Sequence, residues 1–458
     1  MTQRFFIETF GCQMNEHDSE KISGLLVHRG MIPVSTPEEA DLFLLNTCSV
    51  REKAAQKVYS RLGQMKTRKQ KEANFRIGVV GCVAQQEGQA ILKRAPFVDL
   101  VVGTHLYHTL PDILDQLDTQ PPEQVESRSF THFLKEPAPV EITPVLRRNR
   151  FRAQITIMEG CNKHCSFCIV PFTRGKERNR TSAAILQEAR LAVEAGYVEL
   201  LLLGQTVNSY RDPENRSIKF AHLLARVASL PGLRRIRFTS PHPREFDDET
   251  VAVINQFPTI CNQVHLPVQS GSNPVLRRMR RQYTRERYLE IVEKFRSCDR
   301  PIAFSTDVIV GFPGETEEDF EQTLSLLREV EFESMFSFKY SKRPSTEAES
   351  WEDHVREAEK SRRLMELQQL QREIQLRLHG ERYLGKTFEV LCEGVARDGQ
   401  RRFGRTTSNK IVNFSGEDSA GSFVQVRVTD AGPNSLVGCS VERRRGNQAE
   451  ADVPTRSL

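Results

Sequence analysis

The sequence lacks any long hydrophobic run. None of its 458 residues lies in a stretch that approaches the roughly 20 apolar residues of a membrane-spanning helix. The first 20 residues also lack the apolar core and the small-residue cleavage site of a signal peptide. We therefore expect a protein without membrane spans that is located in the cytoplasm.

A large excess of one charge sign is missing as well. Lys and Arg total 65 and Asp and Glu total 60, so the formal net charge is only +5. That balance does not by itself indicate a nucleic-acid partner. Charged residues make up 27% and hydrophobic residues 38%, which is ordinary for a globular protein, and the length predicts about three domains.

Ten cysteines are present, but a cytoplasmic location argues against a disulfide framework. We therefore expect metal ligands, reactive thiols or buried core residues. The cysteines lie at positions 12, 48, 82, 161, 165, 168, 261, 298, 392 and 439.

Residues 3–118 alternate short apolar runs with amphipathic segments. Strands are predicted at 4–10, 41–47, 75–80 and 98–102, and helices near 16–28, 51–69, 85–94 and 106–117. This alternation indicates an α/β domain with a doubly wound parallel sheet. Residues 119–146 follow as a predicted linker, because 119–145 contain five prolines and little periodicity.

The alternation resumes over residues 147–378. Strands are predicted at 153–158, 198–203, 235–240, 263–268, 305–310 and 335–340, and helices near 182–194, 220–229, 249–256, 285–296 and 317–330. About six βα units predict a partial (β/α) barrel whose site lies at the carboxyl ends of its strands. A long charged helix is predicted near 350–378.

Residues 380–443 are rich in β-strand signals with Gly and Asn turns. They predict a small antiparallel β-barrel of the OB type, with strands within 387–396, 401–414 and 422–441. Residues 444–458 are predicted to be a disordered tail.

Cys161, Cys165 and Cys168 form a C-x-x-x-C-x-x-C motif after the first predicted barrel strand. Three thiolates on one loop can hold three irons of a [4Fe-4S] cluster and leave the fourth iron open. Zinc with His164 as a fourth ligand is the main alternative. The position at a barrel strand end and the positive charge of Lys163 and His164 favour the cluster.

Cys12, Cys48 and Cys82 are far apart in sequence, but each follows a predicted strand. The carboxyl ends of neighbouring parallel strands converge on one crevice, so the three thiols can meet there. They would hold a second cluster with one open iron. The alternative is three buried structural thiols. The other four cysteines have no partners at ligand spacing and are expected to be core or surface thiols.

Over about residues 3–443, the sequence resembles the methylthiotransferase family of radical S-adenosylmethionine (SAM) enzymes. The resemblance is carried by CNKHCSFC and IVPFTRGKERNR (161–180), GCQMNEHDSE (11–20), NTCSVREKA (46–54), GCVAQQEG (81–88), HLPVQSGSNPVLRRMRRQYT (265–284) and DVIVGFPGETEEDF (307–320). Residues 13–20 and 49–62 are most similar to members that modify dimethylallyladenosine in tRNA. The C-terminal barrel is similar to a TRAM domain, an RNA-binding module. Two departures from the family pattern are Thr206, where Asn is expected, and Ser345-Thr346-Glu347, where Gly-Thr-Pro is expected.

The resemblance implies two [4Fe-4S] clusters as metal cofactors and two SAM molecules per turnover. The cluster on Cys161, Cys165 and Cys168 would use one SAM to make a 5′-deoxyadenosyl radical. The cluster on Cys12, Cys48 and Cys82 would carry the methylthio sulfur, with the second SAM as methyl donor. The product would be a methylthio group on C2 of N(6)-dimethylallyladenosine next to the anticodon. These six cysteines are the predicted catalytic and metal-binding residues.

The residues predicted to contact SAM lie at the carboxyl ends of barrel strands, on the same face as the loop with Cys161, Cys165 and Cys168. A purely structural role is the alternative for each, and Gly311 with Gly314 could form a plain strand-to-helix turn. The candidates are Gly204, Gln205, Ser240, His265, Gln269 and Gly311.

Arginines are clustered although the net charge is small. Four clusters are expected to contact RNA phosphates, with Phe403 stacking on a base, and solvated surface is the alternative. They are Arg147, Arg148, Arg150 and Arg152; Arg174, Lys176, Arg178 and Arg180; Arg277, Arg278, Arg280, Arg281 and Arg285; and Arg401, Arg402 and Arg405.

The expected partner is a tRNA with a prenylated adenosine next to the anticodon. The transferase that modifies it is expected to be a monomer. The prenyl group would need an apolar pocket. The resemblance identifies neither the electron donor nor the protein that supplies sulfur. The alternative functions are methylthiolation of a ribosomal protein side chain or of threonylcarbamoyl-adenosine, and a non-enzymatic RNA-binding protein that contains zinc.

Overall fold

The computed structural model describes residues 3–49, 52–72, 74–119, 128–133 and 145–441. The chain forms two compact units, residues 1–371 and 372–458. No helix within the described ranges is long and apolar enough to cross a membrane. The tail predicted at 444–458 lies outside the described residues.

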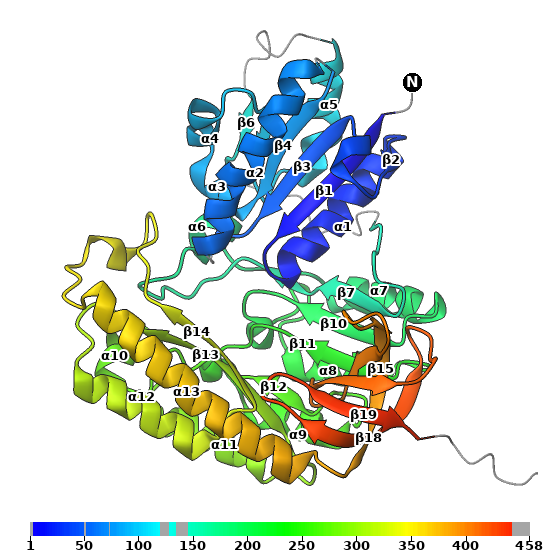
Figure 1. The fold of residues 1–458 in the computed structure, drawn as a ribbon. Helices are drawn as coiled ribbons and strands as arrows, with labels where there is room; N and C mark the ends of the chain where they lie inside the picture. Colours follow the sequence, from blue (N-terminus) through cyan, green and yellow to red (C-terminus); the bar gives the residue numbers. More distant parts are fainter. Residues whose placement is uncertain (1–2, 50–51, 73, 120–127, 134–144, 442–458) are drawn as a thin grey trace, which may run out of the picture. The chain divides into compact units, whose positions relative to one another are not determined.

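The N-terminal part of the first unit is a six-stranded parallel sheet in the order β2-β1-β3-β4-β5-β6 (Figure 1). Its strands are β1 (Arg4–Phe10), β2 (Ile32–Pro33), β3 (Leu42–Thr47), β4 (Arg76–Gly81), β5 (Leu100–Val102) and β6 (Ser129–Phe130). Its helices are α1 (Gln13–His28), η1 (Pro37–Glu39), α2 (Glu52–Lys71), α3 (Cys82–Glu87), α4 (Gln89–Arg94), η2 (Tyr107–Thr109) and α5 (Leu110–Thr119).

Helices cover both faces of this sheet, as the doubly wound prediction requires. Ile22 and Leu26 of α1 pack with Leu114 of α5 on one face. Val58 and Leu62 of α2 pack on the other face, together with residues of α3 and α4. Strands buried on both faces read as continuous apolar runs, which is why the sequence pattern identified them.

This part differs from the sequence prediction in its short elements, among them a break in one predicted helix and an added strand. The helix predicted over 85–94 is two short helices, because Gly88 takes φ +50° between α3 and α4. Within the range predicted as a linker, residues 129–130 form β6, and Val101 N donates to Arg128 O at 2.7 Å. A two-residue strand is too short to leave a periodic signal.

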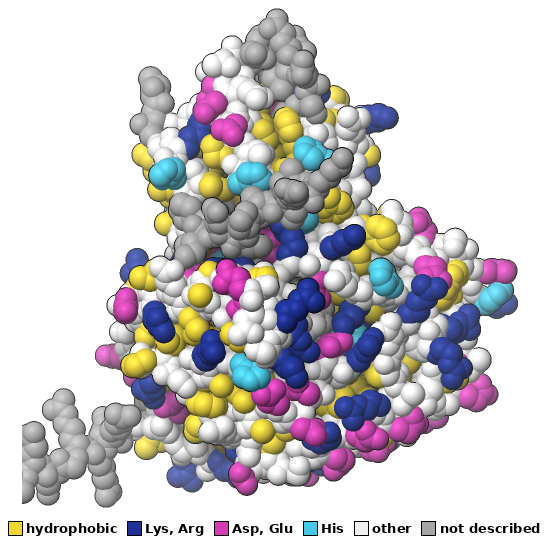
Figure 2. Space-filling model, turned by 180° about the vertical axis from the view of Figure 1, so that it is seen from behind, with side chains coloured by type: hydrophobic (Ala, Val, Ile, Leu, Met, Phe, Trp, Pro, Cys, Tyr) yellow, Lys and Arg dark blue, Asp and Glu magenta, His cyan; other side chains and the backbone are white. Residues whose placement is uncertain are grey.

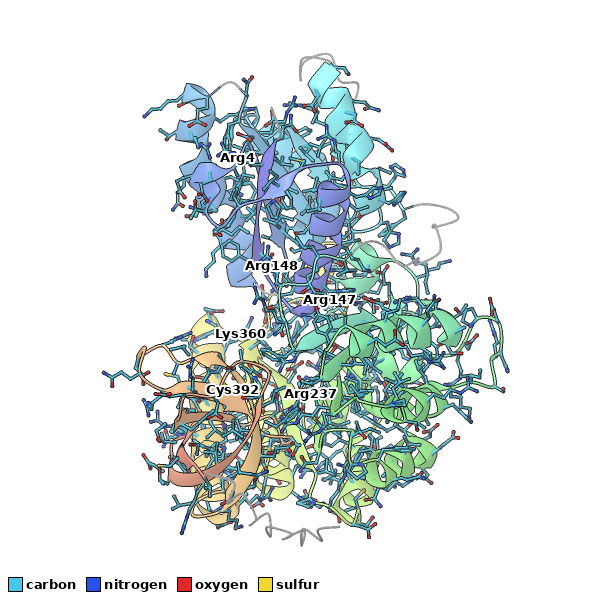
Figure 3. All side chains as sticks on the ribbon, turned by 90° about the vertical axis from the view of Figure 1, so that its right-hand side faces the viewer. Arg4, Arg147, Arg148, Arg237, Lys360 and Cys392 are labelled. Atoms are coloured by element: carbon cyan, nitrogen blue, oxygen red, sulfur yellow. The ribbon has the colours of Figure 1, made fainter. Side chains whose placement is uncertain are left out.

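The residues directly after the linker range contact both parts of the first unit. Arg148 donates from its backbone N to Glu20 Oε1 of α1 at 3.1 Å and from Nη2 to Ile7 O at 3.2 Å. Arg147 pairs with Glu188 at 2.8 Å. Figure 3 shows both arginines between the blue N-terminal sheet and the green barrel strands.

The central part has the six predicted parallel strands. They form two three-stranded sheets, β11-β10-β7 and β12-β13-β14, linked by a parallel bridge between Ile236 and Ile260. The strands are β7 (Arg152–Thr156), β10 (Glu199–Leu203), β11 (Arg235–Phe238), β12 (Gln263–His265), β13 (Ala303–Val310) and β14 (Ser334–Lys339). This order confirms the partial barrel.

The five helices predicted between these strands are all present. They are α7 (Ser182–Glu194), α8 (Phe220–Ala228), α9 (Asp248–Gln256), α11 (Arg285–Arg296) and α12 (Glu317–Val330). Elements without a sequence signal are β8 (Met158–Glu159), α6 (Val170–Arg174), β9 (Arg178–Asn179), η3 (Val207–Ser209), η4 (Pro243–Glu245), α10 (Asn273–Arg278) and η5 (Glu347–Ser350). The long charged helix is α13 (Glu357–Arg382), which begins about two turns later than predicted and also ends later.

The second unit contains a closed barrel in the order β15-β16-β17-β19-β18. Its strands are β15 (Thr387–Val395), β16 (Arg402–Arg405), β17 (Ile411–Ser415), β18 (Phe423–Ala431) and β19 (Leu436–Ser440). The pair β17 and β19 is parallel, so the barrel is not antiparallel throughout as predicted. The crossing β18 separates these two strands in the chain, which lets them run in the same direction. Cys392 lies in its core, as expected for a thiol without ligand partners.

Candidate active site

The loop with Cys161, Cys165 and Cys168 follows β8 at the carboxyl end of β7. The backbone of Cys168 donates to Cys165 O at 3.1 Å, and Cys161 N donates to Gly175 O at 3.1 Å. Gly160 has φ +76°, and a Cβ there would come within 2.1 Å of Lys176 O. Only glycine fits this approach, so the loop is held tightly against the segment after α6.

Polar side chains contact two of the three sulfurs in this loop. Thr206 Oγ1 lies 3.4 Å from Cys161 Sγ, and Arg281 Nη1 lies 3.5 Å from Cys165 Sγ. Burial raises the pKa of Cys161, and burial with the neighbouring Cys165 raises that of Cys168 to about 12. These thiols therefore stay protonated until a metal replaces the proton.

The second cysteine set gathers at three adjacent strand ends. Cys12 caps α1 after β1, Cys48 follows β3, and Cys82 begins α3 after β4. A hydrogen bond with Cys48, reinforced by the charge of Arg174, lowers the pKa of Cys12 to about 6. The charge of Cys12 in turn acts on Cys82, whose pKa is raised by burial. The structure thus places Cys12 within interaction range of both Cys48 and Cys82.

Buried amides fix these strand ends. Asn15 Nδ2 donates to Asn46 Oδ1 at 3.1 Å, and Asn46 Nδ2 donates to Asn15 O at 2.8 Å and to Ser19 Oγ at 2.9 Å. Gly81 has φ +91°, and a Cβ there would come within 2.2 Å of Asn46 Oδ1. The Asn and Gly residues next to the cysteines therefore hold the three strand ends together.

Helix α6 joins the two cysteine sites. Arg174 Nη2 is 2.6 Å from Asp18 Oδ2, and Tyr107 OH donates to the same oxygen at 3.3 Å. Thr104 Oγ1 donates to Thr173 O at 2.6 Å, and His105 Nε2 lies 2.8 Å from Arg174 O. Helix α6 starts two residues after Cys168, so the cysteine loop of the barrel is anchored to the N-terminal sheet.

The chemistry of each cysteine set fits an iron–sulfur cluster, for which thiolates are the usual ligands. Within the part of the chain that the structure describes, no three His, Cys, Asp or Glu side chains lie close enough to hold a single metal ion. The fit rests on three thiols at each site, with Arg281 beside one set and Arg174 beside the other. Both cations suit an anionic cluster.

The six predicted SAM contacts all lie at or just beyond the carboxyl ends of barrel strands. Gly204 and Gln205 follow β10, Ser240 follows β11, His265 ends β12, and Gln269 and Gly311 lie beside or after β13. Their contact with SAM stays a prediction.

Several of these candidates also have contacts that stabilise the fold. Gln205 Oε1 accepts from Gly160 N, so this side chain holds the cysteine loop. Gly311 N donates to Glu315 Oε2 at 2.6 Å in the turn before α12. Ser240 and Gln269 have positive φ values of 54° and 69°, which is a strained conformation for these residues.

Many predicted RNA-binding arginines are instead paired with carboxylates of the protein. The pairs are Arg174 with Asp18, Arg178 with Glu159, Arg147 and Arg180 with Glu188, Arg152 with Glu199, and Arg285 with Glu329. Arg281 is buried at Cys165. Exposed members of the clusters are Arg148, Arg150, Lys176, Arg277, Arg278 and Arg280. Lys and Arg side chains are prominent on the face in Figure 2.

Sequence reasoning missed several residues that contact the sites. Asp18 and Tyr107 gave no signal because Asp18 contacts Arg174 and Tyr107, which are both distant from it in sequence. Thr206 was noted as a departure from the family pattern, and its hydroxyl contacts Cys161. In the other departure, Ser345 N donates to Glu349 Oε2 at 2.8 Å and Glu347 pairs with Arg280 at 2.7 Å.

Three family models match the chain. They are the Uncharacterized protein family UPF0004 at residues 4–103, the Radical SAM superfamily at 155–327 and the TRAM domain at 381–439. A solved structure of the radical SAM methyltransferase TsrM from Kitasatospora setae is similar at TM-score 0.55 and 13% identity, covering 76% of this chain and 75% of that chain. This likeness shows the fold.

Curated relatives are similar over almost the full length. The tRNA-2-methylthio-N(6)-dimethylallyladenosine synthase of Solibacter usitatus is 50% identical over 440 residues, covering 95% of this chain and 97% of the relative. The enzyme of the same name from Koribacter versatilis is 47% identical over 449 residues, with the same coverage. The chain therefore belongs to the tRNA-2-methylthio-N(6)-dimethylallyladenosine synthase family of radical SAM enzymes.

Proposed function

We propose that this protein is a tRNA methylthiotransferase that adds a methylthio group to C2 of N(6)-dimethylallyladenosine next to the anticodon. The carrying observation is the presence of two three-cysteine sites in one compact unit, joined by α6. Relatives at 45–50% identity along the chain carry the name of this activity. A tRNA partner fits the TRAM domain at residues 381–439 and the exposed arginines.

The protein's own residues would bind and orient the two clusters. Cys161, Cys165 and Cys168 would hold the SAM-cleaving cluster, and Cys12, Cys48 and Cys82 the second. When bound, these clusters supply the electron that cleaves SAM and the site that carries the sulfur. C2 of adenine is not acidic enough for ordinary base catalysis, so the difficult step needs such a cofactor.

The surrounding side chains give the two sites different environments. Thr206 and Arg281 contact the sulfurs of the barrel site, while Arg174, held by Asp18, places a positive charge at the other. The predicted SAM contacts lie at barrel strand ends on the side of the first set. These positions support the proposed division into a cleavage site and a sulfur site.

Anaerobic reconstitution tests the proposal. The reconstituted full-length protein should contain about two [4Fe-4S] clusters. With prenylated tRNA it should release both 5′-deoxyadenosine and S-adenosylhomocysteine while the methylthio product is formed. The matched controls are Cys161→Ala, which should stop SAM cleavage, and Cys48→Ala, which should keep cleavage but stop sulfur insertion. Zinc without iron or sulfide would contradict the proposal.

A second experiment separates the possible targets. Mass spectrometry of tRNA and ribosomal proteins from a deletion strain should show loss of the methylthio group from tRNA only. Loss from a protein with unchanged tRNA would instead support the alternative target. A cytoplasmic location and a monomeric state belong to the same proposal, and light scattering of the holoenzyme tests the latter.

A further inference from the structure

The inner face of the strands β12, β13 and β14 carries side chains of which the proposed function has used only His265, as a predicted SAM contact. Strand register places His265 beside Ser305, Asp307 beside Phe336, and Ile309 beside Phe338. Neighbours in a parallel register point to the same face, so these residues form one surface. We call this surface, made of these six residues, the β12–β14 wall.

Contacts show which way the wall faces. On the opposite face, Ser337 accepts from Gln368 of α13 at 3.1 Å, and Phe304 packs on Phe295 of α11 with ring centroids 6.0 Å apart. Helices therefore cover that face, and the β12–β14 wall faces the inside of the partial barrel. Figure 1 shows α11 and α13 beside these strands.

Two aromatic rings on this inward surface are open to solvent. Phe336 is 53% exposed and Phe338 is 39% exposed, although Val308 and Val310 of the neighbouring strand are fully buried on the other face. Phe336 lies edge-on to His265, with ring centroids 6.3 Å apart. Exposed apolar surface inside a barrel indicates a ligand that covers it.

The polar part of the wall is ordered. His265 Nδ1 lies 2.9 Å from Ser305 Oγ, and His265 Nε2 lies 3.4 Å from Asp307 Oδ2. An apolar strip therefore lies next to fixed hydrogen-bonding groups. A ligand that matches this surface would therefore have an apolar substituent on a polar ring.

The wall reaches the cysteine loop of the barrel. Ile309 and Phe167 both pack against the cluster around Phe312, and the rings of Phe167 and Phe312 are 6.2 Å apart. Phe167 lies between Cys165 and Cys168, while Ile309 is the register neighbour of Phe338. Apolar side chains thus form a continuous path from the loop that would hold the SAM-cleaving cluster to the exposed rings of Phe336 and Phe338.

We propose that Phe336 and Phe338 bind the dimethylallyl group of the target adenosine and thereby select prenylated tRNA. This inference rests on the proposed function. The dimethylallyl group is a branched apolar chain on a polar base, which matches an apolar strip beside His265, Ser305 and Asp307. Binding there would bring the base to the cysteine loop.

The test compares two forms of one tRNA, with and without the dimethylallyl group, on the reconstituted full-length enzyme. Binding affinity is measured for both, together with SAM cleavage in the absence of tRNA. The double variant Phe336→Ala/Phe338→Ala should lose the preference for prenylated tRNA by about tenfold or more, since an apolar contact discriminates by that order. SAM cleavage without tRNA should be unchanged.

Two further variants serve as controls. Phe336→Leu/Phe338→Leu keeps apolar bulk and should retain most of the preference, which separates binding from a folding defect. Leu191→Ala removes an apolar side chain of similar exposure, 53%, from α7 and should change nothing.

The outcomes separate this proposal from the proposed function. A wild-type enzyme that gives no methylthio product on prenylated tRNA contradicts both. An active wild type whose double alanine variant keeps the full preference contradicts only the assignment of Phe336 and Phe338. Weaker SAM binding in that variant, with the tRNA preference intact, would assign the wall to SAM and also overturn it.

Discussion

Nη2 of Arg174 lies 2.6 Å from Oδ2 of Asp18, and both side chains are buried. Asp18 comes from α1 of the N-terminal sheet and Arg174 from α6 of the barrel part. This ion pair therefore joins the two parts that carry the cysteine sites. Removal of either partner leaves the other charge buried without compensation.

Asp18→Asn and Arg174→Met should each lower the free energy of unfolding by about 3–5 kcal/mol. Urea unfolding of the metal-free protein measures this. The matched control is Arg287→Met, since the pair of Arg287 with Glu290 is exposed and should contribute less than about 1 kcal/mol. Equal effects of all three changes would show that burial of the Asp18 pair contributes nothing.

The two cysteine sets should bind iron independently. Replacement of Cys12, Cys48 and Cys82 by Ala should reduce iron per chain to about half, and replacement of Cys161, Cys165 and Cys168 should do the same, because each set supplies one cluster. Iron and sulfide analysis after anaerobic reconstitution measures this. As a control, Cys439→Ala removes an exposed thiol and should leave the iron content unchanged. A triple variant that keeps all its iron would refute the corresponding ligand assignment.

Thr206 should support the cluster on Cys161 through its hydroxyl. Thr206→Val removes the contact of Oγ1 with Cys161 Sγ at 3.4 Å while keeping the shape of the side chain. Loss of such a supporting contact typically lowers metal affinity or activity about 10- to 100-fold. Thr206→Ser keeps the hydroxyl and should retain near-normal values. The reduction potential of the cluster, followed by electron paramagnetic resonance, should also shift in the valine variant alone.

Stability should fall as the pH is lowered below about 6.5. Burial lowers the pKa of His242 to about 2 and that of His17 well below its ordinary value. Both histidines are neutral in the folded state, and His242 accepts a hydrogen bond from Arg244 N at 3.2 Å. The unfolded chain binds their protons below its own pKa, so each histidine should cost about 1.4 kcal/mol at pH 5.5.

Urea unfolding at pH 7.5 and pH 5.5 measures this dependence. His242→Gln should reduce the loss of stability between the two pH values, since glutamine does not titrate. His354→Gln is the control, because His354 lies on the surface with its side chain 67% exposed. An unchanged pH dependence in the His242 variant would show that this side chain is not the titrating group.

Gly160→Ala should destabilise the cysteine loop. The new Cβ would lie 2.1 Å from Lys176 O at φ +76°, so the backbone would have to move. Gly196→Ala has a similar φ of +92° but open space around the Cβ, so it measures the backbone strain alone. Thermal unfolding should therefore occur at a lower temperature for Gly160→Ala than for Gly196→Ala. Equal values would argue against a tight approach at Gly160.

The sequence by itself determined the order of the longer strands and helices along the chain, and it predicted the domain bounds and both cysteine sets. It could do so because periodicity and ligand spacing are local properties. Short elements such as β6, and the break at Gly88, left no such signal.

Tertiary structure decided which arginines face solvent and which residues support the sites. Arg174 and Asp18 are 156 positions apart, so only packing shows that this arginine is a buried partner and not an RNA contact. Packing also decides which way Phe336 and Phe338 point, because this depends on which face of β14 the helix α13 covers. Contacts between distant segments depend on how the elements pack, and that information is not present in any local pattern.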